Sequence, residues 1–109
     1  MASHADLPPA FIDFMTYDEF ILSIENDAEP HDMSIFLEAL WWDAKGDWPR
    51  AHSAVDDLED GKGCWVHAYL HRKEGDISNA DYWYRRAGRS RPSVSLQEEW
   101  KAIVMELLT

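Results

Sequence analysis

The chain has 109 residues, six of them tryptophan, with 46% hydrophobic residues and a net charge of −11. This length suits one domain, and this apolar content excludes a wholly disordered chain. The single cysteine, Cys64, excludes an intramolecular disulfide framework and a cysteine-based zinc finger. No apolar run reaches the roughly 20 residues of a membrane span. We therefore expect a cytoplasmic protein that does not contact a membrane.

Charge is unevenly distributed along the chain. Residues 1–60 contain 15 acids and two bases, whereas residues 61–109 contain six acids and eight bases. An acidic body repels phosphate, so we do not expect nucleic-acid binding. A group of arginines in the second half offers either an anion contact or pairing with the acidic half, within the chain or across a homodimer. These arginines are Arg85, Arg86, Arg89 and Arg91.

We expect a disordered tail over residues 1–8 and one domain over residues 9–109. Residues 10–15 are apolar and predict a short helical turn. Thr16 and Glu19 have the spacing of a capping box, which opens a helix of about ten residues. Phe20 and Ile24 lie at helical spacing on its buried face.

The next helix is predicted over residues 31–45 and ends at Gly46, because glycine adopts the left-handed C-terminal conformation at little cost. Asp47 can cap the following helix, with Pro49 tolerated in its first turn. Residues 60–63, with the sequence DGKG, predict a turn.

Three further helices complete the predicted fold. They cover residues 64–74, residues 77–89 after an Asp76 cap, and the C-terminal segment after a second capping box of Ser95 and Glu98. No segment shows a convincing strand alternation. The sequence therefore predicts an all-α fold.

The chain partly repeats itself at a shift of 29 residues. Each unit reads as helix, Gly-Asp turn and helix, and the matched alanines allow close helix packing. Such a helix pair cannot bury both faces alone, so the two units are expected to stack. The matched positions are Ala39 with Ala68, Gly46-Asp47 with Gly75-Asp76, and Ala51 with Ala80.

The second unit resembles the second half of a tetratricopeptide repeat (TPR). The resemblance implies two TPR-like antiparallel hairpins between an N-terminal helix and a C-terminal capping helix, in a non-enzymatic protein-protein interaction module. The shift of 29 departs from the family's usual period of about 34. The block over residues 65–88 also resembles short bacterial proteins, which implies a bacterial source. The positions that fit the repeat are Gly75, Ala80, Tyr84, Ala87 and Pro92.

The same resemblance places the first helix of each unit along a concave groove. In the second unit it implies that Trp65, Tyr69, Arg72 and Lys73 face this groove. Aromatic rings and two cations can hold an acidic segment or a C-terminal carboxylate of a protein or peptide partner. The alternative is that the N-terminal helix fills the groove.

Three adjacent aromatic residues, Tyr82, Trp83 and Tyr84, lie on one helix and cannot all face one core. Tyr84 is the predicted core member. Exposed aromatics beside arginine are typical of binding hot spots, which makes Trp83 and Arg86 partner-binding candidates. The alternative is that these aromatics pack on the terminal helix through Trp100.

His67 and His71 stand where a TPR helix has core side chains, and their spacing places both imidazoles on one helix face. This spacing is a common way to hold a divalent metal such as zinc. Glu74 lies one turn further, and Glu38 and His52 can approach from the preceding unit. The alternative is that the two histidines are structural and hydrogen-bond to neighbours.

The sequence contains no glycine-rich phosphate loop, no Gly-x-Ser-x-Gly elbow and no His-Glu-x-x-His motif. We therefore expect no enzymatic activity and no cofactor in the first hypothesis, a partner-binding module. A metal-binding or hydrolytic helical protein that uses His67 and His71 is the second hypothesis.

Overall fold

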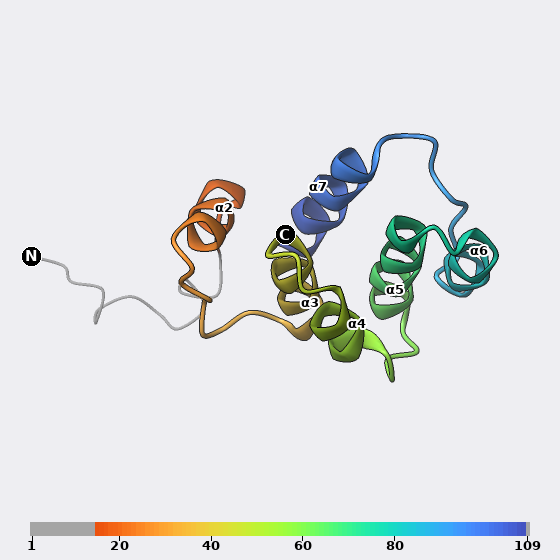
Figure 1. Ribbon diagram of the computed structural model, residues 1–109, viewed down its shortest axis with the longest axis horizontal. Helices are drawn as coiled ribbons and strands as arrows, with labels where there is room; N and C mark the ends of the chain where they lie inside the picture. Colours follow the sequence, from red (N-terminus) through yellow and green to blue (C-terminus); the bar gives the residue numbers. More distant parts are fainter. Residues whose placement is uncertain (1–14, 109) are drawn as a thin grey trace, which may run out of the picture.

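The structure is a computed structural model that describes residues 15–108, and within them it contains six helices and no strand (Figure 1). The all-α prediction is confirmed. The predicted tail lies outside the described residues, as does most of the predicted turn over residues 10–15. None of the described helices is long and apolar enough to cross a membrane. The helices are α2 (Tyr17–Glu25), α3 (Ile35–Ala44), α4 (Trp48–Val55), α5 (Gly61–Glu74), α6 (Ile77–Arg86) and α7 (Leu96–Leu107).

Two packed helix pairs, α3 with α4 and α5 with α6, form the body of the fold. Their connections pass through Gly46 and Gly75, whose φ angles of +85° and +90° are left-handed. Glycine adopts this conformation without a Cβ penalty, which explains the repeated Gly-Asp turn. The alanines that repeat at the same shift are all fully buried: Ala39, Ala68, Ala51 and Ala80.

Helix α7 packs against the first helix of each pair, α3 and α5 (Figure 1). The Trp100 indole of α7 donates a hydrogen bond to the Leu40 carbonyl at 3.1 Å, and Ile103 and Val104 are fully buried. Helix α2 contributes Phe20, whose ring centre lies 6.0 Å from that of Trp100. The C-terminal helix therefore covers the face that the resemblance assigned to a groove.

Two predicted helix starts differ from the structure. Helix α3 begins at Ile35 rather than residue 31, because the Ser34 hydroxyl caps it by accepting from the Leu37 amide. Helix α5 begins at Gly61, inside the predicted turn, because Asp60 caps the Gly63 amide. A Cβ at Gly63 would lie 2.6 Å from Leu58 Cβ, so this glycine permits close packing rather than a turn.

Helix α6 is shorter than predicted and ends at Arg86 instead of residue 89. Gly88, at φ +73°, reverses the chain before Pro92 is reached. Asp76 occupies the N-cap position without accepting from a backbone amide of α6, and its carboxylate instead accepts from the Asn79 side-chain Nδ2 at 3.3 Å. Both capping boxes, at α2 and α7, are present as predicted.

Candidate metal centre

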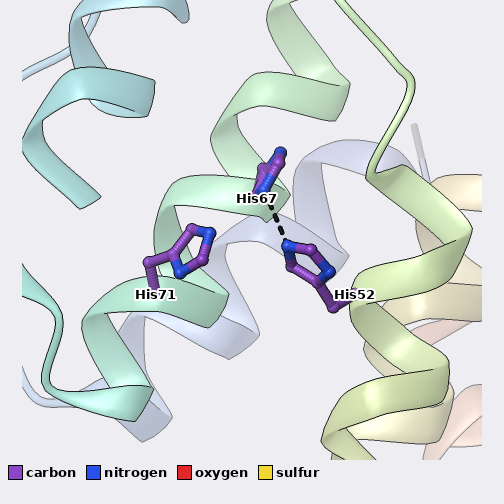
Figure 2. A group of neighbouring side chains, drawn as sticks. All are labelled: His52, His67 and His71. Atoms are coloured by element: carbon purple, nitrogen blue, oxygen red, sulfur yellow. Dashed lines mark hydrogen bonds between the residues drawn. The ribbon is translucent and has the colours of Figure 1, made fainter. Parts of the chain in front are cut away.

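Three histidines from two helices converge between α4 and α5. Helix α5 carries His67 and His71 one turn apart, and α4 brings His52 opposite them (Figure 2). One ring nitrogen of each histidine lies within 4.8 Å of those of the other two. His52 Nε2 and His67 Nε2 are 2.9 Å apart, so one donates a hydrogen bond to the other.

Two tryptophans enclose this three-histidine cluster. The Trp83 ring stacks on His67 with 4.0 Å between ring centres, and the Trp48 ring stacks on His52 at 4.8 Å. His67 is 2% and His71 7% exposed. Apolar walls of this kind exclude water and strengthen electrostatic interactions inside the cluster.

Burial keeps His67 neutral at physiological pH. Desolvation, followed by the charges of His52 and His71, lowers the pKa of His67 to about 4. A neutral imidazole has a lone pair that can bind a metal. Among residues 15–108, His67 Nδ1 is also the one buried side-chain polar atom without a hydrogen-bond partner.

A carboxylate orients the third histidine. Glu74 Oε1 lies 3.0 Å from His71 Nδ1, where it can accept that N–H. The other nitrogen, Nε2, faces the remaining two rings (Figure 2) and lies 3.4 Å from the Asn79 amide nitrogen. A metal-binding histidine commonly donates its second N–H to a carboxylate, which fixes the tautomer and the ring orientation.

The structure brings some of the predicted metal ligands together and leaves one apart. His67 and His71 share the cluster, and Glu74 lies beside it in a second convergent group with His71 and Asp76. Glu38 belongs to neither convergent group found within residues 15–108. His52 completes the cluster. The internal repeat allowed this approach of His52 from the preceding unit.

The residues predicted to line a partner groove bind two buried carboxylates of the same chain. The indole of Trp65 donates to Glu99 Oε2 at 3.2 Å, and Arg72 pairs with Glu99 Oε1 at 2.8 Å. In the same way Tyr69 donates to Asp43 at 2.9 Å, and Lys73 pairs with Asp43 at 2.9 Å. Trp65 and Tyr69 are buried, so their contacts lie with α7 and α3 rather than with solvent.

The remaining partner candidates lie on α6. Trp83 packs on His67 rather than on Trp100, and the Arg86 guanidinium lies 5.2 Å from the Trp83 ring centre. Arg86 also pairs with Glu59 at 3.0 Å. That ion pair joins the basic second half to the acidic first half within one chain, one of the two pairings that the charge pattern allows.

Comparisons of the chain with protein-family models, with curated proteins and with solved structures give no match.

Proposed function

We propose that this protein binds a divalent transition-metal ion through His52, His67 and His71. The observation that carries the proposal is the convergence of one ring nitrogen from each histidine within 4.8 Å of the other two. Three imidazoles are a ligand set typical of zinc, copper and nickel. The apolar enclosure and the carboxylate on His71 are the surroundings that such ligands commonly have.

One pair of ring nitrogens is already spaced for an ion, whereas the third nitrogen, within 4.8 Å of the other two, has to move closer. Zinc–nitrogen distances of about 2.0–2.1 Å in a tetrahedron separate two ligand nitrogens by roughly 3.3 Å. The nitrogens of His52 and His67 are 2.9 Å apart, so a shift of a few tenths of an ångström suffices there. Because His67 is already neutral near pH 7, binding does not have to displace a proton from it.

A carboxylate lies near one of the three ligands. Asp56, the C-cap residue of α4, has its Oδ1 3.8 Å from His52 Nε2 and lies outside the convergent group. A carboxylate there can close a structural site, whereas a bound water would create a hydrolytic one. The burial of His67 and His71 favours a metal held between helices over hydrolysis of a large substrate.

Metal titration of tag-free, chelator-treated protein tests the proposal. We expect one Zn²⁺ per chain by isothermal titration calorimetry, and the intense visible absorption of tetrahedral Co²⁺ on cobalt addition. His67→Ala removes one of three ligands and should weaken Zn²⁺ binding at least 100-fold. His31→Ala is the matched control, because His31 is an exposed histidine before α3 and should bind metal like the wild type.

Two results would overturn the metal proposal. One is the absence of stoichiometric Zn²⁺ or Co²⁺ binding by folded wild-type protein. The other is equal loss of binding in His67→Ala and His31→Ala, which would place the metal elsewhere. Circular dichroism of each variant separates loss of a ligand from loss of the fold.

A second candidate function is the binding of a partner segment, supported by a cavity of about 460 Å³ beside α7. Tyr69 and Lys73, two of the predicted groove residues, line it together with apolar side chains of α2. This cavity retains an apolar wall, which suits an extended peptide segment, while its cation, Lys73, is already paired with Asp43. The lining from α2 consists of Tyr17, Ile21, Ile24 and Glu25.

Selection from a library of peptides with free C-termini tests this second function. Ile21→Arg fills the cavity and should abolish binding of the peptides that the wild type selects. Leu22→Arg is the control, because Leu22 is the next residue and is 54% exposed outside the cavity. Peptides that bind the wild type and Ile21→Arg equally, or no selected peptide at all, would contradict this function.

A further inference from the structure

A second hollow, independent of the histidine cluster, lies where α6 runs into the loop that leads to α7. Its volume is about 280 Å³. Three arginines line it, in a chain whose net charge is −11. The full lining is Asp81, Tyr84, Arg85, Arg89, Ser90 and Arg91.

Two of the three arginines are held in place by contacts that leave part of each guanidinium free. Arg89 lies flat over the Trp65 ring, with Cζ 3.4 Å from the ring centre. Arg91 is fixed by Asp81, which its Nε contacts at 2.8 Å. Groups positioned in advance bind a ligand at a smaller entropic cost.

The third arginine, Arg85, is exposed, and its side chain makes no hydrogen bond or ion pair with residues 15–108. All five of its N–H donors are therefore available. The hydroxyl of Ser90, also exposed, adds another donor to the lining. Two carbonyls at the end of α6, those of Arg85 and Tyr84, already accept from the amides of Gly88 and Arg89. They therefore do not compete with a ligand for the arginine donors.

We propose that this arginine hollow binds the phosphoryl group of a small phosphorylated molecule. Three guanidinium groups face two carboxylates, Asp81 on Arg91 and Glu106 on Arg89, and the remaining positive charge favours a phosphate anion. Planar guanidinium groups bind phosphate oxygens in pairs, which lysine cannot do. The volume accommodates a phosphoryl group with a few further heavy atoms, and the charged lining suits a hydroxylated chain better than an aromatic base.

One existing ion pair has to break before all three arginines can bind the phosphoryl group. Arg89 Nη2 lies 3.3 Å from Glu106 Oε2 at the surface. That distance exceeds the usual 2.7–2.9 Å of a charge-assisted hydrogen bond, so the exchange of this contact for phosphate costs little. Arg89 can remain stacked on Trp65 during the exchange.

Titration of the full chain with inorganic phosphate and glycerol phosphate tests the proposal. We expect chemical-shift changes at the arginine Nε–H signals of Arg85, Arg89 and Arg91 in ¹⁵N NMR spectra. Arg85→Gln should weaken binding of both probes at least tenfold, because a charged hydrogen-bond partner is lost. Arg86→Gln is the matched control: it removes the same charge from the next residue, outside the hollow, and should change affinity less than twofold.

Each alternative ligand predicts a different result. Equal weakening by Arg85→Gln and Arg86→Gln would show general attraction to positive charge and would overturn the proposal. Tighter binding of a phosphoserine peptide than of glycerol phosphate would overturn the small-molecule assignment. Acetate or citrate binding as tightly as glycerol phosphate would overturn the preference for phosphate. Failure of the metal proposal does not affect any of these outcomes.

Discussion

Helix α5 presents two polar faces that differ in how completely their groups are paired. One face contacts α3 and α7, where each of two buried carboxylates has a cation and a tyrosine hydroxyl as partners. The other face contacts α4 and α6, where three imidazoles meet and His67 Nδ1 has no hydrogen-bond partner among the described residues. Both faces are buried, and both carry polar side chains where apolar ones are expected.

The difference separates a stabilising network from a candidate site. A carboxylate with several donors is satisfied by the fold and offers little to a ligand, so Glu99 and Asp43 are best explained as structural. On the other face one ring nitrogen from each of three histidines converges, and a metal is a ligand that three convergent imidazoles can share. The face with His52, His67 and His71, the histidine face, therefore differs from the other by a buried nitrogen without a hydrogen-bond partner among the described residues, and not by polarity alone.

We call the face of α5 that contacts α3 and α7 the paired face. The largest expected effect is the loss of stability when its hydrogen-bond network is broken. Glu99→Ala leaves Arg72, Tyr84 and Trp65 without their shared acceptor. We expect the free energy of unfolding to fall by about 3–5 kcal/mol, the usual cost of removing one partner of a buried ion pair. Urea denaturation followed by circular dichroism measures it. Asp57→Ala, at an exposed acid after α4, is the control.

The paired-face interpretation also predicts an order among variants. Glu99→Gln preserves the shape and an acceptor, so it should lose less stability than Glu99→Ala. If Glu99→Ala and Asp57→Ala unfold at the same urea concentration, the network does not stabilise the fold and the comparison between the two faces fails.

The histidine face should gain stability from a ligand, unlike the paired face. Zn²⁺ at 100 times its dissociation constant should raise the free energy of unfolding by about 2.7 kcal/mol, because it binds only the folded chain. Thermal unfolding with and without Zn²⁺ measures the shift, and a chelator should reverse it. His52→Ala should show no shift, whereas Glu99→Gln should still show one. An equal shift in His52→Ala would contradict the assignment.

The histidine face should also make the stability of the metal-free protein depend on pH. His67 has a folded-state pKa near 4, below the usual 6.5, so the unfolded chain binds one more proton between these values. Its contribution to stability is complete above pH 6.5 and is lost as the pH falls toward 4, with a slope approaching about 1.4 kcal/mol per pH unit. The test is urea denaturation of wild type and His67→Leu from pH 7.5 to 5. Parallel pH profiles would contradict the buried, neutral state of His67.

The sequence predicted the helices because their signals are local. Capping boxes at Thr16 and Ser95 and the glycines at positions 46 and 75 determine helix ends through nearby atoms alone. The start of α5 at Gly61 was missed for the opposite reason: Gly63, which packs on Leu58, looks the same in sequence as a glycine that turns the chain.

The candidate site was only partly predictable, because it depends on contacts between helices. The spacing of His67 and His71 is a property of one helix, so it could be predicted. The approach of His52 depends on the angle between α4 and α5, and the engagement of Arg72 and Lys73 by Glu99 and Asp43 depends on where α7 and α3 pack. Residue spacing within one helix determines neither arrangement, although the repeat allowed His52 and Glu38 to approach from the preceding unit.

The smallest expected effect is the change in metal-free stability when His67 is replaced by an apolar residue. His67→Leu removes a buried nitrogen without a partner and retains apolar contact with Trp83. Loss of the His52 hydrogen bond opposes this gain, but His52 is partly exposed and can bind water instead. We expect a change within about 1 kcal/mol of wild type, because an apolar replacement for a poorly paired buried polar group is nearly neutral. Urea denaturation in a chelating buffer at pH 7.5 measures it. A loss of unfolding free energy as large as that of Glu99→Ala would instead make His67 a structural residue. The contrast between these two variants therefore tests whether the two faces of α5 differ in function.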